Sequence, residues 1–215
     1  MGPAGRASFF AHQQESGMWN TEPLLRGILA NTSLAQWGVE TRLLGYCWGK
    51  LYRAEILQNC RFPEEVALRE DTCFTLQAVA AARRLGFLPD IDYRYTLRAT
   101  PYRPEAEGLV TAYLAYYRSF ISNQKIDLEP EYNIAALYGY MEYIKMAALH
   151  RDAPGNRAVQ IQLIKSSFFR EPWSSAFAKV DPYILPFQYR LLRSAFLHRW
   201  PEGIHLLHRL NAMRL

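Results

Sequence analysis

Two adjacent carboxylates, Glu70 and Asp71, stand directly ahead of a run of helix-forming residues in the segment LREDTCFTLQA, residues 68–78. A carboxylate held in place at a helix start is suited to take a proton from a substrate hydroxyl, and a positioned general base speeds such a step by roughly 10²–10⁴-fold. Asp is also a preferred capping residue at helix N-termini, where it contributes about 1 kcal/mol. Both interpretations of Asp71 stay open, and they are compatible because a capping Asp keeps a second oxygen.

The residues around this pair predict the elements that would position it. Helix formers run from Thr72 to Leu85, and Gly86 follows where a helix commonly ends. Earlier, residues 20–31 combine a capping residue, a proline in the first turn and apolar residues at helical spacing, which predicts a short amphipathic helix. Later, residues 91–98 (IDYRYTLR) alternate strictly between apolar and polar side chains, which predicts a half-buried strand.

The sequence changes character near residue 100. Three segments between residues 108 and 169 have helical apolar spacing, and a last helical pair follows Pro182. We therefore predict an α/β region over residues 1–100 and an all-helical region over residues 101–215.

Three pieces of the chain, taken in order, are more specific than any one alone. They are CWGKLYRAEIL with RFPEE, then REDTCF, then DYRYTLR. Together they resemble the C-terminal, acceptor-side half of family 2 glycosyltransferases, which are inverting enzymes with a GT-A fold. The matching residues are Trp48, Lys50, Leu51, Tyr52, Arg53, Phe62, Pro63, Glu70, Asp71, Phe74, Tyr93, Tyr95 and Arg98. Gly49 stands where the family usually has Asn.

This resemblance implies a fold, a reaction and a set of site residues. Residues 1–100 would form the C-terminal part of a GT-A-like domain, and Asp71 would remove the proton from an acceptor hydroxyl that attacks a nucleotide sugar with inversion. Glu70 would orient the acceptor or adjust the base. Trp48, Lys50 and Arg53 would line the acceptor side; the alternative is that Trp48 belongs to the core and the two cations lie on the surface. The acceptor would be a saccharide or a lipid-linked saccharide, as in polysaccharide biosynthesis.

The nucleotide-binding half of such an enzyme is missing from this sequence. In the family, an opening strand and a D-x-D motif that holds Mg²⁺ or Mn²⁺ precede the W-N-K-L-Y-R piece, whereas the 47 residues before Trp48 contain no aspartate. The string DID at residues 90–92 comes after the Glu70–Asp71 pair and is typical of a turn before a strand. The cysteines and histidines show no metal-ligand spacing, so we predict no metal ligand here. The chain is expected to be a fragment that is inactive alone.

The basic residues gather at the C-terminal end. The net charge of the chain is +5, and residues 183–215 hold five arginines and a single acid, Glu202. Ile184, Phe187, Leu191, Leu192, Ala195 and Phe196 form an apolar helical stripe. Such a basic amphipathic helix suits an anionic membrane surface, or else the stripe packs on neighbouring helices. No nucleic-acid-binding module is recognisable.

Composition and cysteine use indicate the location of the protein. The three cysteines form no C-x-x-C pair, and the sequence has no signal peptide and no apolar run long enough to span a bilayer. We expect a cytoplasmic protein, with peripheral attachment to the inner face of the membrane left open. The rival to the glycosyltransferase hypothesis is a non-catalytic helical interaction or membrane-surface protein that retains only the scaffold.

Overall fold

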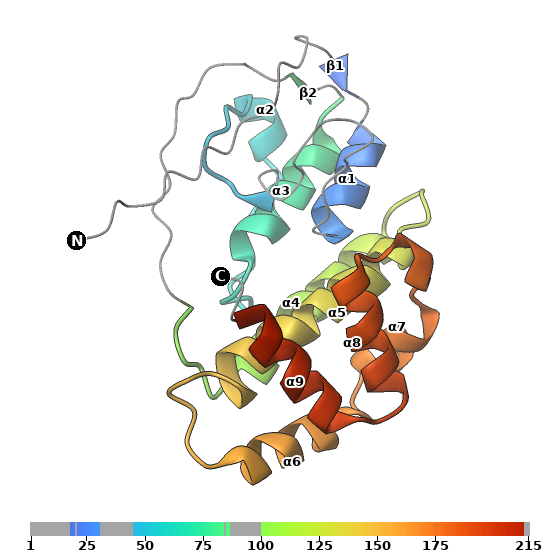
Figure 1. Ribbon diagram of the computed structural model, residues 1–215. Helices are drawn as coiled ribbons and strands as arrows, with labels where there is room; N and C mark the ends of the chain where they lie inside the picture. Colours follow the sequence, from blue (N-terminus) through green and yellow to red (C-terminus); the bar gives the residue numbers. More distant parts are fainter. Residues whose placement is uncertain (1–17, 20, 31–44, 84, 87–99, 213–215) are drawn as a thin grey trace, which may run out of the picture.

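Helix α5 (Glu129–Tyr143) is the element around which the other helices pack in this computed structural model. Ten of its fifteen residues are buried. It contacts α1 (Thr21–Ala30), α4 (Ala106–Ser122) and α7 (Trp173–Lys179), and Figure 1 shows α4 and α5 side by side. A helix buried on most sides needs apolar residues all round, which is why α5 shows little amphipathic pattern.

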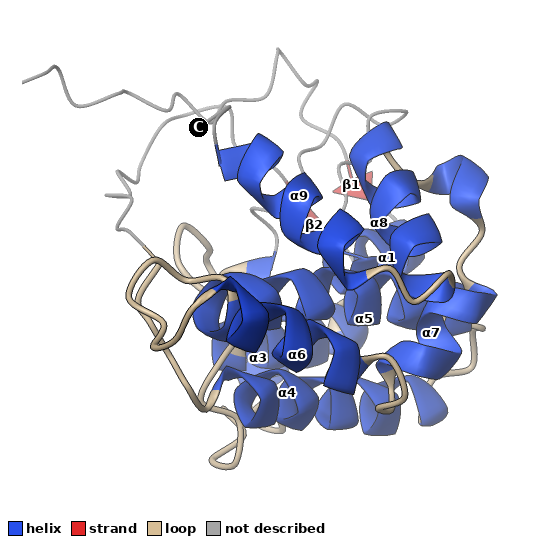
Figure 2. Cartoon of the chain, turned by 60° about the horizontal axis from the view of Figure 1, so that its bottom comes forward, coloured by secondary structure: helices blue, strands red, loops and turns tan. Residues whose placement is uncertain are grey.

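Residues 18–19, 21–30, 45–83, 85–86 and 100–212 are described by the structure. The other helical elements are α2 (Ala54–Leu57), α3 (Glu70–Ala81), the π-helix η3 (Ile144–Ala148), α6 (Arg157–Ser167), the 3₁₀ helix η4 (Pro182–Ile184), α8 (Phe187–Leu197) and α9 (Pro201–Ala212). Within the described residues, no helix is both long and apolar enough to cross a membrane. Figure 2 shows how far helices dominate the described part of the chain.

The α/β fold expected for the first part is wrong. Among the described residues, strands occur only as β1 (Met18–Trp19) and β2 (Leu85–Gly86), an antiparallel pair in which Met18 lies opposite Gly86. The apolar faces of α1 and α3 pack on other helices: α1 contacts α3 and α5, and α3 contacts α4. The GT-A-like α/β interpretation therefore does not hold. The strand predicted at 91–98 lies outside the described residues.

The helical predictions are confirmed, with shifted boundaries. The helix expected at residues 20–31 is α1, and the segments predicted beyond residue 100 form α4, α5, α6, α8 and α9. Helix α3 begins two residues earlier than predicted and ends at Ala81, because Ala82 already has an extended backbone. Gly86 consequently belongs to β2 and does not terminate a helix. The division at residue 100 stays a prediction, and one hydrophobic cluster includes residues from both sides of it.

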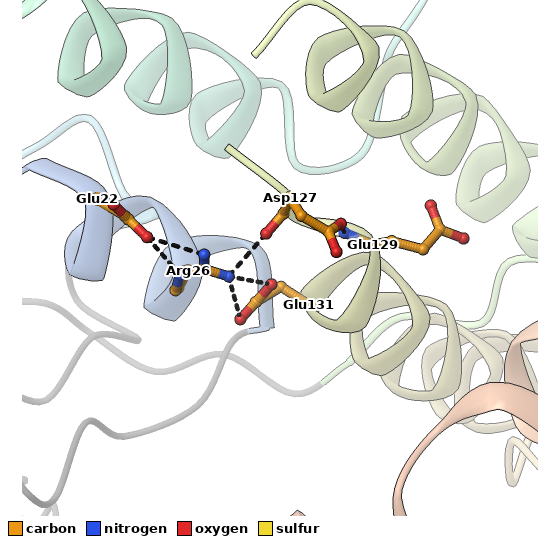
Figure 3. A network of polar contacts seen from close by, with 5 residues as sticks. All are labelled: Glu22, Arg26, Asp127, Glu129 and Glu131. Atoms are coloured by element: carbon orange, nitrogen blue, oxygen red, sulfur yellow. Dashed lines mark hydrogen bonds and ion pairs between the residues drawn. The ribbon is translucent and has the colours of Figure 1, made fainter. Parts of the chain in front are cut away.

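Arg26 joins helix α1 to the start of α5 (Figure 3). Its guanidinium donates to Glu22 on its own helix. It also donates to both carboxylate oxygens of Glu131, each of which lies 3.0 Å from the donor nitrogen. It also donates to the backbone carbonyl of Asp127 at 2.8 Å, and the side chain of Asp127 accepts the Glu129 N–H at 3.0 Å. The turn before α5 and the first turn of α5 are therefore held against α1.

Gly139 allows helices α4 and α5 to approach closely. A β-carbon at this position would lie 2.5 Å from the hydroxyl of Tyr113 and 2.9 Å from Cγ1 of Val110, both on α4. Contacts this short force neighbouring atoms to move in a core that is already filled.

We expect Gly139→Ala to lower the free energy of unfolding by about 1–2 kcal/mol, because overpacking outweighs the gain in helix propensity. Gly108 is the matched control, since it lies in helix α4 with open space around its β-position. Gly108→Ala should raise the free energy of unfolding by up to about 1 kcal/mol. Urea unfolding followed by circular dichroism measures both changes. Stabilisation by both substitutions would contradict the close approach at Gly139.

Candidate functional site

Asp71 lies in the first turn of α3 and is not the residue that caps it. The N-cap position belongs to Arg69, whose side chain makes no capping hydrogen bond. One carboxylate oxygen of Asp71, Oδ1, accepts the backbone N–H of its neighbour Thr72 at 2.7 Å. The interpretation of Asp71 as the N-cap is therefore wrong, although its carboxylate does satisfy one of the N–H groups at the helix start.

The two oxygens of Asp71 have different surroundings. While Oδ1 is anchored on Thr72, Oδ2 accepts no hydrogen bond from any described residue. The side chain is half-buried, and burial raises the pKa of Asp71 above its ordinary value, against the lowering effect of the Thr72 N–H. The charge of neighbouring Glu70 raises this pKa further. A carboxylate with one hydrogen-bonded oxygen, one oxygen without a partner among the described residues and a raised pKa has the properties of a general base.

Arg69, just before α3, attaches this helix start to the helical core. Its Nε lies 3.1 and 3.0 Å from the two carboxylate oxygens of Glu142, near the end of α5. Glu142 also accepts the hydroxyl of Tyr113 on α4 at 2.9 Å. The side chains of Arg69 and Glu142 are only 20% and 28% exposed. Burial by itself would lower the pKa of Arg69, but the charge of Glu142 keeps it above the ordinary value.

The backbone of Arg69 is in the left-handed region, with φ 62°. For a residue with a side chain this conformation costs roughly 1–2 kcal/mol relative to the right-handed region. The ion pair with Glu142 and the packing of Arg69 over the Tyr113 ring, 5.5 Å from its centroid, offset that cost. We call Arg69, Glu142 and Tyr113 the Arg69 clamp.

The loop of residues 45–50 lies against the start of α3. The position of a β-carbon on Gly45 would be 3.2 Å from the hydroxyl of Thr72, so the loop and the helix are in close contact. Lys50 donates from Nζ to the carbonyl oxygen of Tyr46. Burial lowers the pKa of Lys50 to about 8, and the charges of Cys47 and Asp71 act in the opposite direction. Lys50 and Asp71 are thus near enough to interact electrostatically.

Two aromatic stacks flank this helix start. Trp48, which is half-buried, stacks on Tyr46 with ring centroids 4.8 Å apart. Phe62, which is 49% exposed, stacks on Phe74 at 4.4 Å, and Tyr52 meets Phe74 edge-on. Phe74 is three residues after Asp71 on the same helix, so its ring lies on the neighbouring turn of the same face.

The other predicted site residues are more exposed. Glu70 is the first residue of α3 and is exposed to solvent. Arg53 is exposed at the N-cap of α2, and its guanidinium makes no hydrogen bond or ion pair with another described residue. The structure therefore brings Lys50 toward Asp71 and leaves Arg53 on the surface, without a contact that links it to the acid pair. The roles assigned to these residues stay predictions.

No metal-binding cluster occurs in the part of the chain that the structure describes. No group of three or more His, Cys, Asp or Glu side chains is arranged to hold an ion there. Asp90 and Asp92 of the DID string lie outside the described residues. The donor set that a divalent cation prefers, several convergent carboxylate oxygens, is not provided by Glu70 and Asp71 alone. The described residues do not fit a Mg²⁺ or Mn²⁺ site.

Comparison with known proteins finds a similarity that covers part of the chain. The chain is 36% identical over 72 residues to the "Uncharacterized glycosyltransferase EpsJ" of Bacillus subtilis (strain 168), a match that covers 30% of this chain and 21% of that protein. The chain thus spans about a fifth of the length of the curated relative it matches. No family model matches the chain, and no solved structure matches it. Part of the chain is glycosyltransferase-like. Membership of family 2 is not shown.

We expect Glu142→Gln to lower the free energy of unfolding by about 2–3 kcal/mol, because it leaves the half-buried guanidinium of Arg69 without its counter-charge. Glu105→Gln is the control, since Glu105 is 58% exposed and lies 3.9 Å from Arg103. That substitution should change stability by less than about 0.5 kcal/mol. Urea unfolding at neutral pH gives both values. Equal effects of the two substitutions would show that the Arg69 clamp contributes no more than a surface pair.

The lowered pKa of Lys50 predicts a specific pH dependence of stability. The folded protein releases the Lys50 proton near pH 8, whereas the unfolded chain holds it to its ordinary pKa of 10.5. Between these values the unfolded state binds more protons, so the free energy of unfolding of the wild type should rise with pH relative to Lys50→Met. Parallel urea titrations of both proteins from pH 7.5 to about 10.5 test this. A difference that is flat or falls over this window would rule out a buried ammonium.

Proposed function

We propose that this chain is the acceptor-side part of a glycosyltransferase that moves a sugar from a nucleotide sugar to a saccharide or lipid-linked saccharide acceptor, with inversion. Asp71 is the general base of this reaction. Its Oδ2 takes the proton of the acceptor hydroxyl while the acceptor oxygen forms a bond to the anomeric carbon. The bond from that carbon to the diphosphate breaks, and the nucleoside diphosphate departs with the bonding electron pair.

The observation that carries the proposal is the asymmetric environment of the Asp71 carboxylate. Oδ1 is fixed by the Thr72 N–H, and Oδ2 has no partner among the described residues. Burial raises the pKa of Asp71, which strengthens the ionised carboxylate as a base. The partial similarity to a glycosyltransferase supplies the reaction class. Either observation without the other would leave the function open.

Neighbouring side chains offer contacts for an acceptor sugar. Phe62 presents an exposed ring beside Phe74, and Trp48 and Lys50 lie in the loop that contacts Thr72. Ring faces suit the apolar faces of sugars, and an ammonium suits hydroxyl and phosphate oxygens. In this proposal Glu70, which is exposed next to Asp71, accepts a hydrogen bond from a further hydroxyl of the acceptor. Arg53 would act only where the acceptor extends along the exposed surface.

The described residues account only for the acceptor side of this reaction. In related enzymes a divalent cation supplies charge neutralisation for the leaving diphosphate. The described residues do not fit such an ion, so no step of this proposal passes through it. The steps assigned to this chain are acceptor binding and proton removal at Oδ2 of Asp71.

Asp71→Asn tests the proposed base. Asn keeps the oxygen that accepts the Thr72 N–H and nearly the same shape, but it has no carboxylate to take the proton. We expect an unchanged melting temperature and at least a hundredfold lower release of nucleoside diphosphate (roughly 10²–10⁴-fold for a general base). The assay supplies nucleotide sugars and saccharide acceptors to the longest natural polypeptide that contains this chain.

Glu64→Gln is the control for this experiment, because Glu64 is an exposed acid of the preceding loop that takes no part in the proposed chemistry. It should retain wild-type transfer. Equal transfer by Asp71→Asn and the wild type would remove Asp71 from the mechanism. A wild-type protein that transfers sugar from no donor would favour the rival, a non-catalytic protein that retains the scaffold.

A further inference from the structure

Exposed apolar side chains are concentrated in the C-terminal helices. Of the fourteen large apolar side chains that are exposed among the described residues, eleven come after residue 158. Single exposed apolar residues are ordinary on a protein surface, but a group on consecutive elements indicates an interaction surface. Helix α8 and the 3₁₀ helix η4 before it carry the densest group.

The apolar stripe predicted for this segment is divided between two sides of α8. Leu192, Ala195 and Phe196 are buried against the core, 2–4% exposed. Phe187 is 68% exposed and Leu191 is 39% exposed. The neighbouring helices cover only one edge of the stripe, so the packing interpretation applies to that edge. The described residues leave the other edge uncovered.

The uncovered edge continues along α8, and Tyr183 and Ile184 of the preceding η4 are exposed as well. Residues three, four and ten positions after Phe187 share its side of the helix, by helical periodicity. We define the α8 face as Phe187, Arg190, Leu191 and Leu197, all of which are exposed.

The charged residue on the α8 face is a cation. Arg190 lies among its apolar residues and is exposed. Arg193 is engaged elsewhere, because it donates to the carbonyl oxygen of Ala178 at 3.2 Å. Helix α8 contains no acid, and the carboxylate of Asp181, just before η4, accepts the Tyr183 N–H at 2.9 Å. A second copy of this chain would bring a like-charged surface against it, which disfavours self-association through this face.

We propose that the α8 face docks on an anionic lipid surface, with its aromatic and aliphatic side chains in the headgroup region and Arg190 against lipid phosphates. The combination of an exposed ring, aliphatic side chains and an arginine on one helix is the chemistry of interfacial helices, which lie in the plane of the membrane and do not cross it. This surface does not include Asp71, so the membrane proposal does not depend on the proposed transfer reaction.

Co-sedimentation with vesicles tests the proposal on the intact chain. We expect binding to vesicles of phosphatidylcholine with phosphatidylglycerol, weaker binding at high salt, and little binding to phosphatidylcholine alone. The double substitution Phe187→Ser and Leu191→Ser should lower the partition coefficient at least tenfold, because both side chains lose apolar contact with lipid. Arg190→Gln should lower it about fivefold, the effect of one arginine near an anionic membrane.

Leu163→Ser is the matched control. Leu163 lies on α6 and is 41% exposed, close to the value for Leu191, but it is outside the α8 face. It should leave the partition coefficient within about twofold, since most surface substitutions are neutral. The circular dichroism spectra of all variants should match that of the wild type because every changed residue is exposed.

Three results would overturn the proposal. They are absence of vesicle binding, equal binding to neutral and anionic vesicles, and an equal loss with Leu163→Ser. Analytical ultracentrifugation adds a fourth. A wild-type dimer that the Phe187→Ser and Leu191→Ser protein no longer forms would identify a second copy of the chain as the occupant of the α8 face.

Discussion

The ion pair between Arg69 and Glu142 is the constraint on which the geometry of the candidate site depends. It joins the residue just before α3 to the end of α5, and Tyr113 links the same carboxylate to α4. Arg69 holds an unfavourable left-handed backbone conformation that turns the chain into α3. Without the clamp, that turn would have little to keep it in place, and Glu70 and Asp71 would no longer have a fixed direction relative to the core.

The clamp explains how a carboxylate next to a cation keeps the character of a base. Arg69 lies two residues before Asp71 and its charge lowers the pKa of Asp71, but this effect is smaller than that of burial. Glu142 accepts from Nε and Nη2 on one edge of the guanidinium, which directs the charge of Arg69 toward α5. Burial therefore decides the pKa of Asp71.

The sequence predicted the elements better than it predicted their assembly. Apolar residues at helical spacing correctly indicated α1, α4, α5, α6, α8 and α9, because each helix must bury a face and its sequence records that face. Helix α7 was missed, since its seven residues are too few for a periodic signal. The end of α3 was placed at Gly86 on local chemistry, whereas the chain leaves the helix at Ala82 and pairs Gly86 with Met18. That pairing joins residues far apart in the sequence.

The candidate site shows the same limit. Residue types indicated Asp71, and the resemblance to glycosyltransferases added Lys50 and Trp48, which do lie in the loop beside α3. The Arg69 clamp carried no sequence signal, because Glu142 is 73 residues away and a lone Glu on a helix is ordinary. The fold class was wrong because it relied on the strand pattern of residues 91–98 and on the resemblance, whereas the described residues of the first part pack mainly as helices. The stripe on α8 was correctly recognised as apolar, but spacing alone does not tell which edge a neighbouring helix covers.

A carboxyl ¹³C NMR titration of Asp71 in the folded chain tests the central claim most directly, because it observes the proposed base itself. The account predicts that Asp71 titrates above its ordinary pKa of 3.8, since burial outweighs the Thr72 N–H and the charge of Arg69. A pKa at or below 3.8 would mean that the carboxylate is solvated or paired with a cation, and would contradict the assignment of Asp71 as the general base.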